Sequence, residues 1–409
     1  MASNGTLPAY RSGLPVAVDA MGGDNGFIVQ VEGAIEAYKD FGARSILVGP
    51  EDDLRSTLDA LGGKHLPLKI RNASQVIAMD DSPARAVRRK PDSSLCVAYQ
   101  LVQSGEASAI LSSGNSGAMM AAGRIILGLL PGIERPAIAT LCPVACSDRP
   151  NVILDSGANV ECHAQNLVQF AVMGAIYYST LFEQERPKVA LLSNGTEASK
   201  GTDVIRATSM ILSQMDTINY IGYVEGRDVT TQAADVIVCD GFVGNILLKS
   251  MEGCVRLIFE QLRHESKKGL VRKLGLGLSK GVYREVFAEK FDYTAHGGAP
   301  LLGLTKLAVV LHGSSDARAV KNAIRLADSF VARKMTEKIA VALTQLDESM
   351  PATNIDGEIL SGVFATKRAE AAGFGKRVEA KKAEGRREVE DDDGEPDTVE
   401  IEAPDLVDR

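Results

Sequence analysis

The chain has 409 residues, of which 45% are hydrophobic, and its formal net charge is −8. This length and apolar fraction are enough for a large folded core. No run approaches the roughly 18 apolar residues of a membrane-spanning helix. Residues 1–13 lack the apolar stretch of a secretory signal. Residues 388–409 carry eleven acidic residues and one basic residue, so the rest of the chain is slightly positive, and the 5% aromatic content without tryptophan argues against a base-stacking nucleic-acid surface.

Short apolar runs alternate with helical patterns along the chain. Strands are expected at 14–20, 45–48, 66–70, 109–111, 137–141, 151–154, 188–192, 220–224, 236–238 and 307–311. Helices are expected between them, among them 84–90, 94–102, 117–123, 161–182 and a long helix after 315 that runs toward 346. Ser82 and Pro83 fit the cap and first position of the helix at 84–90. The alternation predicts an α/β fold, a three-layer α/β/α arrangement with a mainly parallel sheet.

The composition divides the chain into three parts. Residues 14–350 show no internal boundary and are expected to form one domain. Residues 1–13 read as a flexible N-terminus, and residues 351–409 read as an acidic, disordered tail that the chemistry does not need. The six cysteines lack C-x-x-C spacing and are expected to be reduced, buried thiols: Cys96, Cys142, Cys146, Cys162, Cys239 and Cys254. The five histidines lack H-E-x-x-H spacing, which argues against a zinc site.

The stretch 107–123 reads A-S-A-I-L-S-S-G-N-S-G-A-M-M-A-A-G, a strand that runs into a Gly/Ser/Asn turn and then a helix. Such a turn presents backbone N–H groups and hydroxyls to an anion, phosphate above all. Ser113, Gly114, Asn115 and Ser116 are therefore candidate phosphate-binding residues, although one such turn alone is more often an ordinary strand-to-helix connection. The same pattern recurs at several other strand ends, where parallel sheets bind their ligands.

The loop S-N-G-T-E-A-S-K-G at 193–201 adds charged groups to this pattern. Asn194 and Gly195 can aim donors at an oxyanion, and Lys200 supplies a positive charge. The alternative is that Glu197 and Lys200 form an i,i+3 surface pair. His296 and His312 sit by Gly-rich turns and are either proton carriers or buried histidines bonded to the backbone. No P-loop, G-x-G-x-x-G or G-x-S-x-G motif is present.

Residues 245–290 form a basic helical segment, which we call the basic segment. Val255, Ile258, Phe259 and Leu262 follow helical spacing, and nine basic residues stand against three acidic residues between 245 and 284. One interpretation is a dimer helix with a solvated basic face. The other is a surface for an acidic carrier protein or anionic lipid, carried by Arg263, Lys267, Lys268, Arg272 and Lys273.

Taken together, the loops resemble those of one family. V-D-A-M-G-G-D, S-S-G-N-S-G-A, R-P-A-I, D-S-G-A-N, S-N-G-T-E-x-x-K-G, Y-V-E-G-R-D, C-D-G-F-V-G-N, H-G-G-A-P-L-L-G and H-G-S-S occur in the order found in bacterial phosphate acyltransferases, the acyl carrier protein:phosphate acyltransferases of phospholipid synthesis. The resemblance covers about 15–346. It departs at Asn25, Gly26 and Phe27, where a small residue and proline are expected, and at Ser116, where threonine is expected.

The resemblance implies a fold similar to the isocitrate/isopropylmalate dehydrogenases and to phosphotransacetylase. It implies reversible formation of acyl phosphate from long-chain acyl-[acyl carrier protein] and inorganic phosphate, without cofactor or metal, to feed phosphatidic acid synthesis. It also implies a cytoplasmic homodimer at the membrane periphery, near the membrane glycerol-3-phosphate acyltransferase, with no nucleic-acid partner. Catalytic roles then fall to Asn194, Lys200, Asp240 and Asn245, and phosphate binding to Ser113, Gly114, Asn115, Ser116, Asn159 and Gly195.

Three other functions remain as alternatives. A phosphotransacetylase-like enzyme would use acyl-coenzyme A in place of the carrier protein. An NAD-dependent decarboxylating dehydrogenase on a similar fold would need acidic metal ligands and an adenine-pocket motif, and neither is evident in the sequence. A non-catalytic membrane scaffold would not need so many polar strand-end loops.

Overall fold

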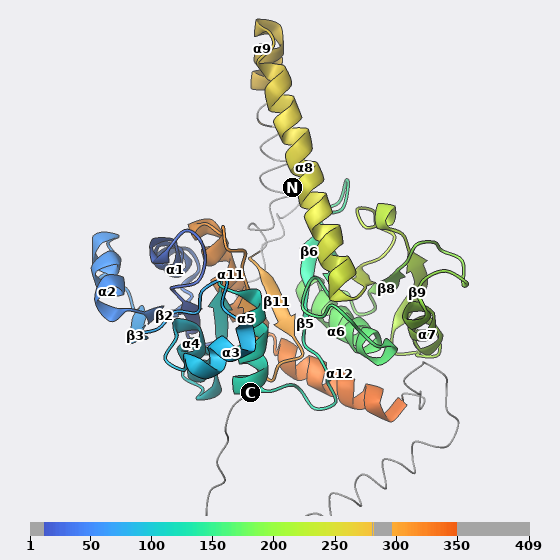
Figure 1. Ribbon diagram of the computed structural model, residues 1–409, viewed down its shortest axis with the longest axis horizontal. Coiled ribbons are helices and arrows are strands. Elements are labelled where there is room, and N and C mark those ends of the chain that lie inside the picture. The colour runs from blue at the N-terminus through green and yellow to red at the C-terminus, as the bar shows by residue number, and fades with distance from the viewer. Residues whose placement is uncertain (1–11, 280, 282–296, 350–409) are drawn as a thin grey trace, which may run out of the picture. The chain divides into compact units, whose positions relative to one another are not determined.

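The computed structural model describes residues 12–279, 281 and 297–349, and these residues form two sheets (Figure 1). The first sheet has the strand order β3-β2-β1-β4-β12-β11-β5 and the second has the order β6-β7-β10-β8-β9. The first comprises β3 (Lys69–Asn72), β2 (Ser45–Gly49), β1 (Val16–Asp19), β4 (Ala109–Ser112), β12 (Leu307–Val310), β11 (Ala299–Leu302) and β5 (Ala137–Ile138). The second comprises β6 (Thr140–Cys142), β7 (Asn151–Leu154), β10 (Val236–Val238), β8 (Lys188–Leu192) and β9 (Asn219–Val224).

The α/β prediction with mainly parallel strands is confirmed. Antiparallel pairing is confined to β11, which pairs with β12 and β5, and to β6, which pairs with β7. The central strands are buried on both faces, which explains why they read as continuous apolar runs. The carboxyl ends of β1, β4 and β12 therefore lie together in one sheet, as do those of β7, β8 and β10 in the other.

Helices cover both faces of the sheets because alternate strand residues face opposite sides. Val16 and Val18 of β1 join the core cluster that includes α1, α11, α6, α7 and α12, whereas Ala17 joins the cluster of α3, α4 and α5. The first turns of α8 cover the outer face of the second sheet. The helices are α1 (Phe27–Phe41), α2 (Glu51–Ala60), α3 (Pro83–Arg89), α4 (Ser94–Gln103), α5 (Ser116–Ala122), α6 (Ala164–Phe182), α7 (Asp203–Leu212), α8 (Gly241–Ser266), α9 (Leu270–Leu278), α11 (Ala317–Ala332) and α12 (Met335–Ser349).

Two predicted elements are each divided in the structure. The single strand expected at 137–141 is two strands, because β5 belongs to the first sheet and β6, after Ala139, belongs to the second. The long helix expected toward 346 is broken at Lys334, whose φ of 54° is left-handed. This turn buries Met335 and allows α12 to pack against α6.

Other boundaries shift for local reasons. The strand expected at 66–70 begins only at Lys69, because Pro67 has no N–H to donate. The helix expected from 161 begins at Ala164, where His163 and Asn166 form a capping box. Strand β11, which contains Pro300 and follows two glycines, was missed. All six cysteines are free thiols, but Cys146 and Cys254 are exposed, so the prediction that every thiol is buried is wrong.

Candidate active site

The loops after β1, β4 and β12 interlock at one end of the first sheet. The Asp24 N–H donates to the Gly313 carbonyl at 2.7 Å, and the Asn25 side-chain amide donates to the carbonyls of Ser314 and Ser315, each at 3.0 Å. A Cβ on Gly22 would stand 2.7 Å from the Gly114 nitrogen, so the first two loops are in backbone contact that only glycine permits. The departure from the family pattern at Asn25 thus supplies a link between loops.

The buried hydroxyls of Ser112 and Ser113 connect the loop after β4 to the loop after β1. The Ser112 hydroxyl donates to the Asp19 carboxylate at 2.7 Å. The Ser113 hydroxyl donates to the Gly22 carbonyl at 2.9 Å and accepts from the Gln30 amide at 2.8 Å. Burial raises the pKa of Asp19, and hydrogen bonds from Ser94 and Ser112 oppose that rise. Ser113 is 1% exposed, and both of its hydrogen bonds join it to the loop after β1 and to α1.

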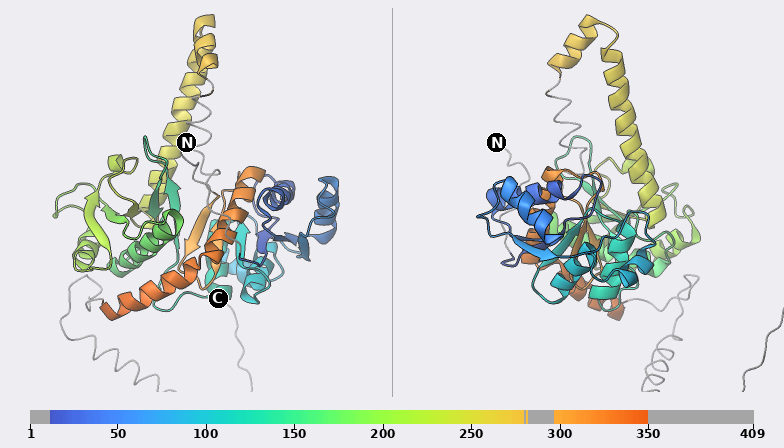
Figure 2. Two further views of the ribbon diagram at one scale, coloured as in Figure 1. Left: turned by 180° about the vertical axis from the view of Figure 1, so that it is seen from behind. Right: turned by 60° about the vertical axis from the view of Figure 1, so that its left-hand side comes forward.

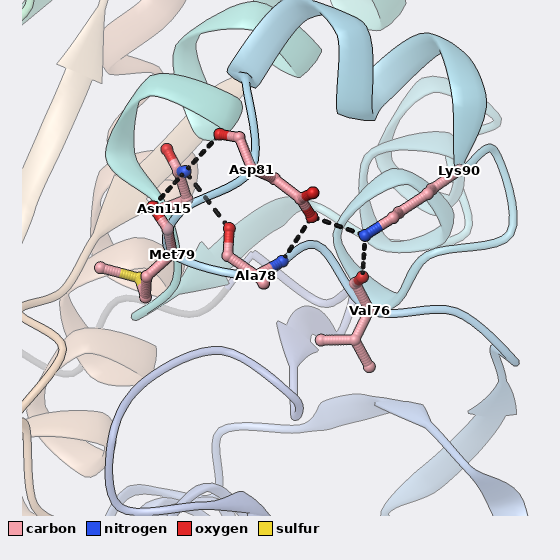
Figure 3. Close-up of polar contacts among 6 residues, drawn as sticks. All are labelled: Val76, Ala78, Met79, Asp81, Lys90 and Asn115. Atoms are coloured by element: carbon pink, nitrogen blue, oxygen red, sulfur yellow. Dashed lines mark hydrogen bonds and ion pairs between the residues drawn. The ribbon is translucent and has the colours of Figure 1, made fainter.

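Asn115 and Ser116 stand at the start of α5 and differ in what their side chains do, and Figure 3 shows the contacts of Asn115. The Asn115 Oδ1 accepts from the Ala118 N–H at 3.0 Å, and its Nδ2 donates to the carbonyls of Ala78, Met79 and Asp81. Every polar atom of the Asn115 side chain is therefore used within the protein. Ser116 is exposed, and its hydroxyl makes no hydrogen bond with the described part of the chain.

Asp155 organises the loop after β7 in the second sheet. Its Oδ1 accepts from the N–H groups of Ile138, Gly157 and Ala158, and its Oδ2 accepts from the N–H and the side-chain amide of Asn159, at 2.7–3.2 Å. Burial raises the pKa of Asp155, and these hydrogen bonds oppose that rise. Asn159 is also buried and donates to the Pro136 carbonyl at 2.8 Å. Because 136–140 passes from the first sheet to the second, Asp155 and Asn159 fasten the second sheet's loop to that crossing.

The loop after β8 carries the candidate cation Lys200. The Asn194 Oδ1 accepts from the Gly201 N–H at 2.9 Å, which closes the loop at its base. A Cβ on Gly195 would stand 2.6 Å from the Lys200 Cγ, so the lysine stem crosses directly over this glycine. Among the residues that the structure describes, no carboxylate pairs with the Lys200 ammonium, so the surface pair with Glu197 that the sequence left open is not formed.

The loop after β10 and the start of α8 complete the second group. Asp240 caps α8, with its Oδ1 accepting from the Val243 N–H at 2.9 Å. Asn245 is exposed in the first turns of α8 and lies near Gly157, whose built Cβ would be 3.6 Å from the asparagine Oδ1. The second sheet therefore gathers Asn159, Asp240 and Asn245 around one pair of loops.

The candidate residues thus form two groups, one on each sheet. The first group contains Ser113, Gly114, Asn115 and Ser116. The second contains the other candidate catalytic and phosphate-binding residues: Asn159, Asn194, Gly195, Lys200, Asp240 and Asn245. Within the described ranges, no hydrogen bond or ion pair joins the 113–116 loop to the 194–200 loop. His312 bonds to Ser314 in the first group, at 2.8 Å between Nδ1 and Oγ, whereas His296 lies outside the described residues.

Asp19 and Asp155 are the site-forming residues that the sequence reasoning missed. Each follows the last apolar residue of a buried strand, in V-D-A-M-G-G-D and D-S-G-A-N. An acidic residue at that position is itself a signal, because a carboxylate there can accept the backbone N–H groups of the following turn. Within the described ranges, no group of three or more His, Cys, Asp or Glu side chains is arranged to hold a metal ion.

The basic segment is described from 245 to 279 and at 281. Within its predicted apolar stripe, Ile258 and Phe259 are exposed, whereas Val255 and Leu262 are half-buried. Helix α8 is continuous from Gly241 to Ser266, and α9 turns away from its end (Figure 2). Val271 is 83% exposed and Leu278 is 90% exposed. Glu265 accepts from Lys268 at 2.5 Å and from Arg272 at 2.6 Å, whereas Arg263, Lys267 and Lys273 have no acidic partner among the described residues.

Comparison with known proteins places the chain beside one enzyme family. Residues 14–338 match the family described as "Fatty acid synthesis protein". The chain is 44% identical over 336 residues to a phosphate acyltransferase of Geotalea daltonii, with 82% of this chain and 95% of that protein covered. It is 46% identical over 328 residues to a phosphate acyltransferase of Syntrophotalea carbinolica, with 80% and 93% covered.

The fold also has a solved counterpart. A phosphotransacetylase from Streptococcus pyogenes superposes with a TM-score of 0.55 at 18% sequence identity, and 81% of this chain and 97% of that chain are covered. At that identity the likeness concerns the fold, and it agrees with the α/β architecture expected from the sequence.

Proposed function

Because the chain belongs to the bacterial phosphate acyltransferase family, we propose that it forms acyl phosphate from long-chain acyl-[acyl carrier protein] and inorganic phosphate. A phosphate oxygen attacks the thioester carbonyl carbon, the C–O bond forms, and the C–S bond breaks. The electron pair of that bond leaves on the pantetheine sulfur, which then takes a proton. The transfer needs no cofactor. It needs a held phosphate and donors for the tetrahedral oxyanion.

The observation that carries this proposal is the Lys200 ammonium, which stands at a strand end without an acidic partner in the described part of the chain. We assign direct phosphate contact to Lys200, Asn194, Ser116 and the backbone at Gly114 and Gly195. Ser113, Asn115 and Asn159 hold the loops, because their side-chain donors bond within the protein, whereas Asn194 uses only its side-chain oxygen among the described residues. Asp240 and Asn245 orient the thioester or the thiol.

The donor is tested by supplying palmitoyl-[acyl carrier protein] or palmitoyl-coenzyme A with labelled phosphate and measuring acyl phosphate. We expect kcat/KM for the carrier-protein donor to exceed that for the coenzyme A donor by at least about tenfold, since a protein donor adds contacts that the nucleotide lacks. Equal or better use of coenzyme A would favour the phosphotransacetylase-like alternative. Phosphate-independent consumption of both donors would exclude acyl transfer to phosphate.

We further propose that the protein is a homodimer that meets the membrane through its basic segment and serves phosphatidic acid synthesis there. The support is the combination of solvent-facing apolar residues and cations on α8 and α9. A long-chain acyl phosphate has an apolar chain and a labile anhydride bond, so it is best transferred at the bilayer to the membrane glycerol-3-phosphate acyltransferase. No helix among the described residues is long and apolar enough to cross a bilayer.

Charge reversal tests this surface. Each Lys or Arg near an anionic bilayer contributes about 1 kcal/mol, so changing four of them to Glu is expected to abolish sedimentation with vesicles containing anionic lipid. The same variant should raise KM for the carrier protein and leave the dimer intact. The reversed residues are Lys267, Lys268, Arg272 and Lys273, and a control of equal charge reverses Arg55, Lys64, Lys69 and Lys188. If vesicle binding and carrier-protein KM are both unchanged, the segment is a dimer helix with a solvated face.

A further inference from the structure

The connection between β3 and α3 is held in place by one side chain from the start of α5 and one from the end of α3. Residues 76–81 of this connection, which we call the 76–81 segment, lie between Asn115 at the start of α5 and Lys90 just after α3 (Figure 3). From one side, the Asn115 amide donates to three carbonyls of the segment, the shortest bond being 3.0 Å to Met79. From the other side, the Lys90 ammonium donates to the Val76 carbonyl at 3.0 Å.

Asp81 joins these two attachments. Its carboxylate accepts from the Lys90 ammonium at 2.5 Å and from the Ala78 N–H at 2.8 Å, while its own carbonyl accepts from the Asn115 amide at 3.3 Å. The hydrogen bonds from Lys90 and from the Ala78 N–H lower the pKa of Asp81. Asp81 thus binds the Lys90 ammonium through its side chain and accepts from the Asn115 amide through its backbone carbonyl.

We propose that Lys90 and Asp81 are positioning residues for the phosphate loop at 113–116, acting through the 76–81 segment and Asn115. The inference rests on the proposed function, since it concerns how that loop is kept ready for phosphate. The Asn115 side chain has two tasks: its Oδ1 caps α5 at Ala118, and its Nδ2 needs the carbonyls of the segment. Those carbonyls converge on Nδ2 only while Lys90 and Asp81 keep the segment folded.

The pair is placed to affect the site more than overall stability. The side chains of Lys90 and Asp81 are 32% and 29% exposed, and a partly exposed ion pair contributes little to the free energy of unfolding. The residues before the segment have separate attachments, because the Ser74 N–H and hydroxyl both donate to Asp92. Loss of the pair therefore loosens 76–81 locally, and the Asn115 side chain and the exposed Ser116 beside it lose their fixed position.

The test uses the full chain and the variants Lys90→Met and Lys90→Arg. Methionine keeps the length of the stem but removes the charge, whereas arginine keeps the charge. Lys64→Met is the matched control, because Lys64 pairs with Asp59 at 3.8 Å in the connection that follows α2, outside the 76–81 segment. The steady-state readouts are KM for phosphate, KM for the acyl donor and kcat. A second readout is the inorganic phosphate concentration that slows hydrogen exchange of backbone amides at 113–118.

We expect Lys90→Met to raise the phosphate KM and the protecting phosphate concentration by about five- to tenfold, as a small displacement of a binding loop does. The acyl-donor KM and the melting temperature should match those of Lys64→Met, and Lys90→Arg should recover most of the loss. Phosphate values equal to those of Lys64→Met, or an equal loss for both substrates, would overturn the inference. The exchange readout does not depend on turnover: if the unaltered protein forms no acyl phosphate but phosphate still protects 113–118, the proposed function fails while the positioning role is still decided.

Discussion

Replacing Asp155 with Ala is expected to lower the free energy of unfolding by at least about 3 kcal/mol, the largest stability effect that we predict for a single side chain. The carboxylate is fully buried and accepts five hydrogen bonds, from the backbone of Ile138, Gly157, Ala158 and Asn159 and from the Asn159 side chain. Each buried donor left without an acceptor costs about 1–3 kcal/mol, and relaxation or entering water can satisfy only some of them.

Denaturant unfolding measures this loss, and Asp316→Ala is its control. Asp316 also follows a strand and precedes a helix, but its Oδ1 accepts a single backbone bond among the described residues, from the Ala319 N–H at 2.9 Å, so its loss should cost about 1 kcal/mol. Asp155→Asn provides a milder change. Its Oδ1 can still accept from Ile138, Gly157 and Ala158, but its NH₂ group cannot accept from the two Asn159 donors. The interpretation fails if Asp155→Ala costs no more than Asp316→Ala. If the alanine variant does not fold, the asparagine variant must still lose more than the control.

The residues around Asp155 also show what the sequence can and cannot predict. The strand end at Leu154 and the polar turn after it were predicted, because a short apolar run followed by Gly and Asn is a local pattern. The hydrogen bond from Ile138 to Asp155 was not predicted. It exists because β5 belongs to the first sheet and β6, which begins after a single intervening residue, belongs to the second. A run of five apolar and small residues gives no sign of that division.

Asn115 illustrates the same limit for the candidate site. Its position at a strand-to-helix turn was predicted, and that turn is present. Its amide partners lie 34 to 37 residues earlier in the chain, in a connection without regular periodicity, so spacing could not reveal them. The residue type indicated an anion contact, but it gave no sign of the hydrogen bonds that join this side chain to 78–81.

Lys200→Ala is expected to produce the largest loss of activity without loss of folding. A charge-assisted contact to phosphate contributes about 1.5–3 kcal/mol, which corresponds to at least about a tenfold fall in kcat/KM for phosphate. The free energy of unfolding should change by less than about 0.5 kcal/mol, because the side chain is only half-buried and has no acidic partner among the described residues.

Two further variants test whether the loss of activity comes from the Lys200 charge or from its stem, and whether it is specific to the loop that follows β8. Lys200→Met keeps the stem that crosses Gly195 but removes the ammonium, so its phosphate kcat/KM should fall as far as that of Lys200→Ala. Lys188 begins the same strand, β8, and is exposed at the opposite end, so Lys188→Ala should retain full activity. If Lys200→Met were as active as Lys188→Ala, the charge would have no role. If Lys200→Ala and Asn115→Ala were both fully active, the phosphate site would have to lie elsewhere, because one variant removes the cation of the second sheet's loop and the other removes the attachment of the first.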